Sequence, residues 1–286
     1  MNDSRSIRSA SRREFLAAGA SSLAPLGVAA LLGSRARAGQ ASLAGARDDG
    51  ASADDALDAA YERIAARFPD VNIHASNHAP MVVEALGVLG RPGAIGPWLD
   101  AALGEFQRAP ATERRIDPAQ WRAALGRNSG FAAWQALFLA ELGHDDWKLV
   151  LRRWVPRLAP GLAGAATHGL IRTAHGARAL VARDNEVRRR ELATGLAYWA
   201  ITYQELPWDG VEAPEASVEA AFARLEPRLP AVEPPGGSIV AGLSSLAETP
   251  SFRGAAGRID TRDPVRTLCE MSTHFAHLFL RNPERR

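Results

Sequence analysis

The sequence predicts an all-α protein, built as a single-domain helical array, and two observations support this. Apolar residues recur every three to four positions along most of the chain, and no run alternates apolar and polar residues as a half-buried strand does. Hydrophobic residues make up 47% of the chain, which is sufficient for a buried core in one large or two modest domains. A single cysteine, Cys269, excludes an internal disulfide.

The first 38 residues are expected to be an export signal and not part of the fold. Residues 11–16 read SRREFL, a twin-arginine signature, and a weakly apolar run to Gly33 and a small-residue cleavage site at 36–38 follow. A membrane anchor is the alternative, but Pro25 and the many small residues make this run a poor membrane span. We therefore expect a periplasmic or secreted protein, exported folded by the twin-arginine translocase.

Charge and motifs exclude several classes of protein. The signal carries a net charge of +4, which leaves the rest of the chain near −2 from its formal +2. No basic stripe with interleaved aromatic residues remains, so nucleic-acid binding has no support. The sequence has no GxGxxG before a helix, no Walker lysine motif and no CxxC pair, and hence no flavin or nicotinamide motif.

The helices follow a flexible linker over residues 39–52, and the helical domain is expected to span 53–286. The first helix begins with acidic residues at 54–55, and the second begins at Asn77 and ends before Gly90 and Pro92. Arg188 and its two following arginines are expected to form a solvated face. The remaining helices are expected over 94–107, 118–125, 130–142, 145 to the prolines at 156 and 160, 165–180, 185–205, 238–247 and 265–280, with a loop over 229–236.

The stretch AATHGLIRTAHGARAL, residues 165–180, carries a polar stripe on a helix of small residues. His168 and His175 are seven positions apart and lie within about 20° of each other on the helix, with Arg172 between them. The surrounding alanines and glycines allow a neighbouring helix to approach closely or leave room for a ligand. Such a stripe faces solvent, pairs with acids or lines a functional cavity. Two surface or singly hydrogen-bonded histidines are the plain alternative.

A second histidine-bearing stretch starts the helix after Asn77. His78 lies in its first turn, where the helix N-terminus lowers the pKa of a histidine and favours the neutral form that ligates metals. Glu84 follows six residues later, near the same face. A third pair, His274 and His277, is expected on partly exposed helix surface.

Three segments resemble the questin oxidase-like family in order and spacing: SNHAPMVVEALGVLGR, LVLRRWVPRLAPGLAGAATHGLIRTAHGARAL and LATGLAYWAITYQELP. The resemblance runs from about Tyr61 to Phe279 and implies an all-helical fold. The Asn-His motif of the family maps to Asn77 and His78, and the histidine of its Gly-x-x-x-His motif maps to His168. Arg172 stands where other members have a second histidine. The family continues beyond Leu280 into a segment with another histidine, for which His274 or His277 is a candidate substitute.

The resemblance implies an oxidoreductase that inserts oxygen into, or cleaves, a ring of an aromatic polyketide or quinone. We expect Fe(II) held by His78, His168 and His175, with Arg172 stabilising oxyanion charge and Glu84 orienting an imidazole or acting as a base. The sequence leaves open whether NADPH is the external reductant. The alternatives are a metal-free oxygenase that uses histidine general bases and a non-catalytic periplasmic helical binding protein.

Aromatic side chains at helical spacing have two interpretations. They are expected mainly in the core, and the alternative is that they wall an aromatic pocket. The residues concerned are Trp134, Trp147, Trp154, Trp199 and Tyr203.

Overall fold

The computed structural model describes residues 52–72, 75–108, 115–127, 130–206, 214–225, 239–246 and 258–281. The predicted signal and nearly all of the predicted linker lie outside these residues, as does the predicted loop over 229–236. The chain divides into two compact units, Met1–Glu205 and Leu206–Arg286. Within the described ranges no helix is long and apolar enough to cross a membrane.

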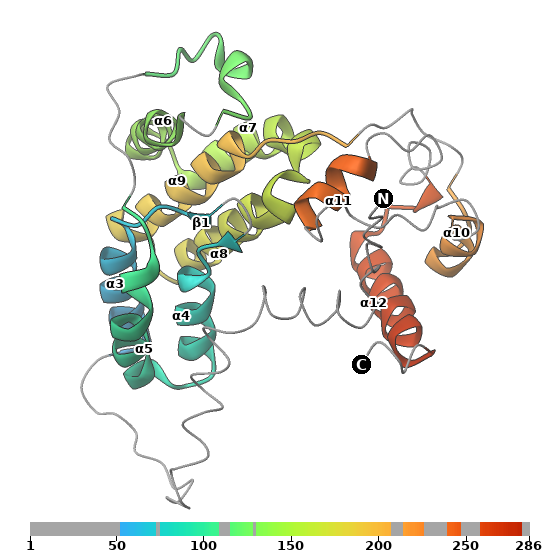
Figure 1. Cartoon of the computed structure of the whole chain (residues 1–286), viewed down its shortest axis with the longest axis horizontal. Helices are drawn as coiled ribbons and strands as arrows, with labels where there is room; N and C mark the ends of the chain where they lie inside the picture. Colours follow the sequence, from blue (N-terminus) through green and yellow to red (C-terminus); the bar gives the residue numbers. More distant parts are fainter. Residues whose placement is uncertain are drawn as a thin grey trace, which may run out of the picture. The chain divides into compact units, whose positions relative to one another are not determined.

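Helices dominate the described residues of both units, which confirms the predicted all-α class (Figure 1). The first unit contains α3 (Ala53–Ile64), α4 (Ala79–Val88), α5 (Ile95–Ala102), α6 (Phe131–His144), α7 (Trp147–Leu158), α8 (His168–Ala182) and α9 (Glu186–Ile201). Short 3₁₀ turns join them: η2 (Pro92–Ala94), η3 (Leu103–Glu105), η4 (Trp121–Ala124), η6 (Ala159–Gly161) and η7 (Gly164–Thr167). The second unit contains α10 (Val218–Leu225), α11 (Ile239–Leu246) and α12 (Pro264–Arg281).

Polar caps explain where several helices begin. Ser52 accepts a hydrogen bond from the Asp55 amide at the start of α3, Asp146 accepts one from the Lys148 amide at the start of α7, and Asn185 starts α9 in the same way. Helix α7 continues through Pro156 to Leu158 and ends between the two prolines that were expected to close it. Pro156 and Arg152 are both exposed, so the Arg152 carbonyl group that loses its helical partner lies on the solvent side of the helix.

A small antiparallel hairpin was not anticipated from the sequence. Strands β1 (Asp70–Asn72) and β2 (Ala75–Ser76) pair Asp70 with Ser76, directly before the helix that carries His78. A helix expected over 118–125 is only the 3₁₀ turn η4, and α10 has no counterpart among the predicted helices. Five-residue strands are about the average, so a pairing this short leaves no periodicity to detect.

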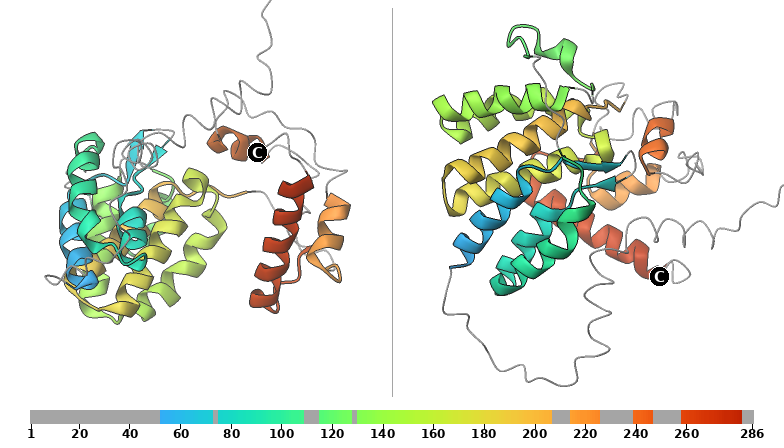
Figure 2. Two further views of the ribbon diagram at one scale, coloured as in Figure 1. Left: turned by 90° about the horizontal axis from the view of Figure 1, so that it is seen from below. Right: turned by 60° about the vertical axis from the view of Figure 1, so that its left-hand side comes forward.

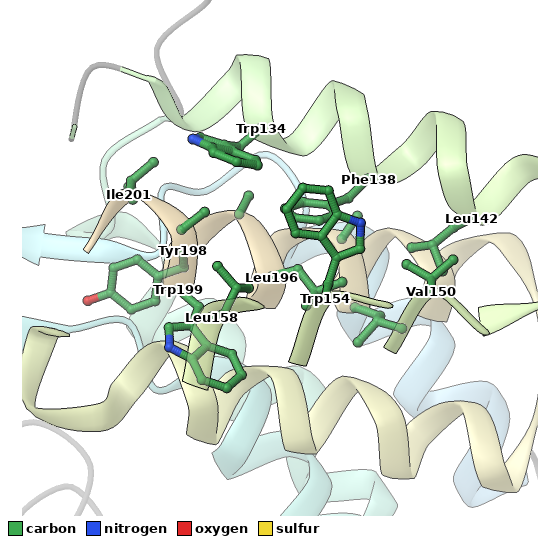
Figure 3. Packing of buried hydrophobic residues seen from close by; sticks show 14 of the residues in the cluster. Trp134, Phe138, Leu142, Val150, Trp154, Leu158, Leu196, Tyr198, Trp199 and Ile201 are labelled. Atoms are coloured by element: carbon green, nitrogen blue, oxygen red, sulfur yellow. The ribbon is translucent and has the colours of Figure 1, made fainter. Parts of the chain in front are cut away.

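The core of the first unit is centred on α9. Every residue of α9 from Glu191 to Ile201 is buried, and this helix packs against α6 and α8. Figure 2 shows α8 and α9 side by side, and Figure 3 shows the aromatic cluster that fills the space between α6, α7 and α9. Trp134, Trp154 and Trp199 are almost fully buried there, which supports the core interpretation of the tryptophans.

A second cluster joins α3, α4 and α5, with Tyr61, Val83 and Leu99 at its centre. The prediction that Arg188 lies on a solvated face is wrong, because its side chain is buried. It donates hydrogen bonds to Asp54, Asp58 and the Ala179 carbonyl group. An arginine is buried only when carboxylates pair with it, and the partners come from α3, more than 100 positions earlier in the chain.

Candidate functional site

Glycines bring α8 and α9 into close contact. Of the two roles expected for the small residues of α8, the structure shows the close approach of a neighbouring helix. A Cβ atom added to Gly169 would lie 2.5 Å from Trp199 Cα, and one added to Gly195 would lie 2.8 Å from Thr173 Cα. Real Cβ atoms do not approach backbone atoms so closely, so these positions require glycine. The small residues thus allow the close approach of α8 and α9, and the two histidines of α8 contact residues outside α9.

The first group of polar side chains joins α4 to the start of α8. His78, the N-cap of α4, places its Nε2 atom 2.9 Å from Nε2 of His168, the first residue of α8. The two rings meet edge to face, with centroids 4.8 Å apart. Two of the three predicted metal ligands are therefore brought together.

The local chain around His78 is fixed by its neighbour Asn77. The Asn77 side chain accepts a hydrogen bond from the Ala79 amide at 2.9 Å and donates one to the Phe68 carbonyl group at 3.3 Å. Partial burial of the His78 ring lowers its pKa, and His168 lowers it further, against the opposing effect of a hydrogen bond to the Ser76 backbone. His78 is neutral near pH 7 as a result, while the residue keeps an exposed side.

His168 is presented by an unusual turn. Ala165, Ala166 and Thr167 all adopt left-handed backbone conformations, with φ of 47°, 51° and 69°. The turn places the Ala165 carbonyl oxygen 2.6 Å from His168 Nδ1. A carbonyl oxygen only accepts, so Nδ1 carries the proton, and in the neutral ring Nε2 is left with its lone pair.

The position of the proton on the His78 ring decides whether the two facing nitrogens form a hydrogen bond. The Ser76 backbone bond favours the charged form of His78, as a carbonyl acceptor does. If the His78 proton is on Nδ1, the two Nε2 atoms point lone pairs at each other across 2.9 Å, and if it is on Nε2, that atom donates to His168. A shared proton or a cation removes that repulsion.

The second group lies about two helical turns further along α4 and α8. His175 Nδ1 contacts a carboxylate oxygen of Glu84, and Arg178 donates to the other oxygen at 2.7 Å. The hydrogen bonds from His175 and Arg178 lower the pKa of Glu84 below its ordinary value, although burial alone would raise it. Glu84 is thus an ionised carboxylate, and its contact with Nδ1 orients the His175 ring.

The third predicted ligand is separated from the first two by this arrangement. His175 pairs with Glu84, and among the residues that the structure describes, no three His, Cys, Asp or Glu side chains are grouped to hold a metal ion. A further histidine, His74, precedes His78 by four positions and lies outside the described residues. His274 and His277 belong to α12 of the second unit, where the His274 ring stacks on Phe222.

Arg172 is buried, whereas His78 is exposed and His168 and His175 are partly buried. Its Nε and Nη2 atoms donate to the two oxygens of Glu191 on α9, at 2.7 and 2.9 Å, and each side chain is no more than 2% exposed. Its Nη1 atom has no hydrogen-bond partner in the described part of the chain. The carboxylate balances its charge, and any role in stabilising an oxyanion would fall to Nη1.

Several residues of the site were missed by the sequence analysis. The Ala165 carbonyl group and the backbone of Ser76 orient the two rings, while Arg178 and Glu191 pair with predicted site residues. Arg178 follows His175 by three positions, a helical neighbour that spacing alone could have identified. The others depend on contacts between distant segments and leave no local signal.

These features define a helical protein with a histidine pair at the junction of two helices. The questin oxidase-like family matches residues 48–279, so the chain belongs to that family, as the resemblance predicted. Membership indicates an oxidoreductase that acts on a small molecule. No curated protein and no solved structure matches the chain.

Proposed function

We propose that the chain is an oxidoreductase that uses O₂ on an aromatic polyketide or quinone, with the His78–His168 pair as its reacting centre. The 2.9 Å between the two Nε2 atoms is the observation that carries the proposal, because the pair needs a proton or a cation between its rings. The family supports the reaction class and, through the sequence resemblance, the aromatic substrate. The exposed side of His78 leaves the pair accessible to a small molecule.

The donor atoms of the pair suit iron. The two Nε2 atoms lie 2.9 Å apart, so both could bind one metal ion at an ordinary ligation distance of about 2.1 Å. Imidazole is a suitable ligand for iron, and the bond from His168 Nδ1 to the Ala165 carbonyl group is of the kind that orients metal-bound imidazoles. His78 and His168 would hold Fe(II), which when bound supplies the binding and activation of O₂.

The protein's own groups would position and deprotonate the substrate. The fixed Nδ1–H of His168 keeps its Nε2 directed at the reacting centre. Glu84 holds the His175 ring through Nδ1, which leaves Nε2 of that ring as the candidate to take a proton from a substrate hydroxyl group. Positioned bases of this kind contribute about 10²–10⁴-fold to rate.

A metal-free oxygenase is the second candidate, favoured by the meeting of only two imidazoles among the described residues. In this case the substrate's electron-rich ring reacts with O₂ directly. The His78–His168 pair then acts as the general base, and the proton that it takes from the substrate is shared between the two Nε2 atoms.

The experiment compares oxygen consumption and metal content. Protein from iron-supplemented cells is assayed with a panel of hydroxylated anthraquinones, with and without NADPH, as wild type, His78→Ala and His168→Ala. Each substitution is expected to lower activity at least about 100-fold. His144→Ala is the control, because His144 is exposed in the last turn of α6, away from the pair.

Metal analysis and chelation separate the two candidates. Iron that is bound by the wild type and lost from both pair variants, with activity abolished by a chelator, supports the iron enzyme. Activity that survives strong chelators supports the metal-free form. Substrate binding without any oxygen consumption, unchanged in both variants, would overturn the enzyme and support the binding protein.

We also propose export to the periplasm by the twin-arginine route, on the strength of Arg12 and Arg13 and the segment that follows them. Cell fractionation with immunodetection tests it. Replacing both arginines by lysine is expected to retain the protein in the cytoplasm. Unchanged export of that variant would contradict this route.

A further inference from the structure

Both histidines of the pair are tethered to the same end of α9. Ser76 lies two residues before His78, and its hydroxyl group shares a buried 2.6 Å hydrogen bond with the Tyr198 hydroxyl group. Tyr198 is 1% exposed. Figure 3 shows its hydroxyl group pointing away from the tryptophan cluster.

The turn that carries His168 rests on the next turn of α9. A Cβ atom added to Gly164 would lie 1.6 Å from the Thr202 carbonyl oxygen, so the chain touches α9 directly at that point. Thr202 is itself bound to Tyr198, since its amide and hydroxyl groups donate to the Tyr198 carbonyl oxygen at 3.1 and 2.8 Å. The amide of Gln204 also donates to the Gly161 carbonyl group, which attaches the start of the same segment.

One helical turn thus supports two segments that are about 90 residues apart. The left-handed residues 165–167 need such support, because non-glycine residues persist in this conformation only where the surroundings enforce it. The two tethers differ in kind. The contact to the His168 turn is made by backbone, whereas the contact to the His78 segment is a side-chain hydrogen bond that substitution can remove.

We propose that Tyr198 is a positioning residue, whose hydroxyl group, through Ser76, holds His78 at bonding distance from His168. Tyr198 touches no reacting atom in this role. Its effect on activity rests on the proposed function, whereas its effect on the geometry of the pair does not. Partners that orient reactive imidazoles typically contribute 10–100-fold to activity or metal affinity.

The test uses the full chain and removes a single oxygen atom. Tyr198→Phe is expected to lower kcat for the anthraquinone oxidation about 10–100-fold, with little change in KM. Tyr61→Phe is the matched control, because the Tyr61 hydroxyl group is also buried but has no hydrogen-bond partner in the described part of the chain. It is expected to leave kcat unchanged.

An NMR readout follows the pair independently of activity. At one fixed pH, His78→Gln is expected to shift the ¹⁵N signals of the His168 ring in the wild-type background. In Tyr198→Phe the same His78 substitution is expected to shift them at most half as much. Ser76→Ala is expected to reproduce the effects of Tyr198→Phe, and the double variant to add no further loss, since the two hydroxyl groups form one bond.

The outcomes separate this inference from the proposed function. An unchanged response of His168 in Tyr198→Phe, an equal loss in Tyr61→Phe, or additive losses in the double variant would each overturn the positioning role. If the chain consumes no oxygen but the NMR response depends on Tyr198, the positioning role stands and the proposed function fails.

Discussion

His175 contacts Glu84, not the His78–His168 pair, although it lies only two turns along α8 from His168. The three predicted ligands are thereby divided between two sites. We expect His175→Asn to retain the iron content of the wild type, because the pair is intact, and to lower kcat through loss of a base. Metal analysis beside oxygen consumption checks this. Loss of iron from His175→Asn, with the fold intact by circular dichroism, would show that His175 is a ligand.

Removing only one partner of the buried Arg172–Glu191 pair should lower the stability of the protein more than removing both. Arg172→Met leaves the Glu191 carboxylate buried without its partner and is expected to lower the free energy of unfolding by about 3–5 kcal/mol. The double variant Arg172→Met/Glu191→Leu removes both charges and is expected to recover most of that loss. Urea unfolding of the three proteins measures the difference. Additive losses in the double variant would contradict this account.

The glycines between α8 and α9 should not tolerate alanine. Gly169→Ala and Gly195→Ala would each force a Cβ atom onto backbone, and each is expected to lower the free energy of unfolding by about 1–3 kcal/mol. Gly143→Ala is the control, because it lies in exposed helix with nothing near its Cβ position. It is expected to stabilise by up to about 1 kcal/mol. Thermal and urea unfolding distinguish these signs, and equal effects at all three positions would refute the close approach.

In the left-handed turn before His168, replacing alanine by glycine should stabilise the protein. Ala166→Gly relieves a conformation with φ of 51°, and after the entropy cost of glycine it is expected to raise the free energy of unfolding by up to about 1 kcal/mol. Ala163→Gly, at φ of −72° in a buried position, is expected to destabilise the protein. Urea unfolding measures both. A destabilised Ala166→Gly would argue against strain at this turn.

Acid stability should depend on Asp184. Its hydrogen bonds from Arg189 lower its pKa below the ordinary 3.8, so the native state favours the charged form. The stabilisation is present above about pH 3.8 and is lost as the pH falls towards the lowered pKa. The stability difference between wild type and Asp184→Asn is therefore expected to be constant near pH 7 and to shrink below pH 4. Urea unfolding across this range tests it, and a difference that grows at low pH would contradict it.

Periodicity predicted the helices because burial of one face repeats locally along the chain. It gave α4, α6, α8 and α9 to within about four residues, and His78 at the start of α4 followed from Asn77. Periodicity could not predict the left-handed turn at 165–167, because the alanines there favour a helix in any sequence-based prediction. The hairpin before His78 was missed because its strands have only two or three residues, too few to show an alternating apolar pattern.

The candidate site was predictable in its residue types but not in its pairings. His78 and His168 were named from separate stretches of sequence, and the structure brings them together. Which histidine joins which partner depends on how α4 lies against α8, and no local pattern encodes that. Arg188 shows the same limit, because its burial depends on Asp54 and Asp58 from α3.

The central helix α9, buried from Glu191 to Ile201, has a consequence for slow motions of the protein. Its amide groups open to solvent only when α6 and α8 separate from it, so their exchange with deuterium should require global unfolding and be the slowest in the chain. Tyr198 and Thr202 lie at the end of this same helix. The histidine pair is therefore attached to the part of the molecule that is expected to unfold last.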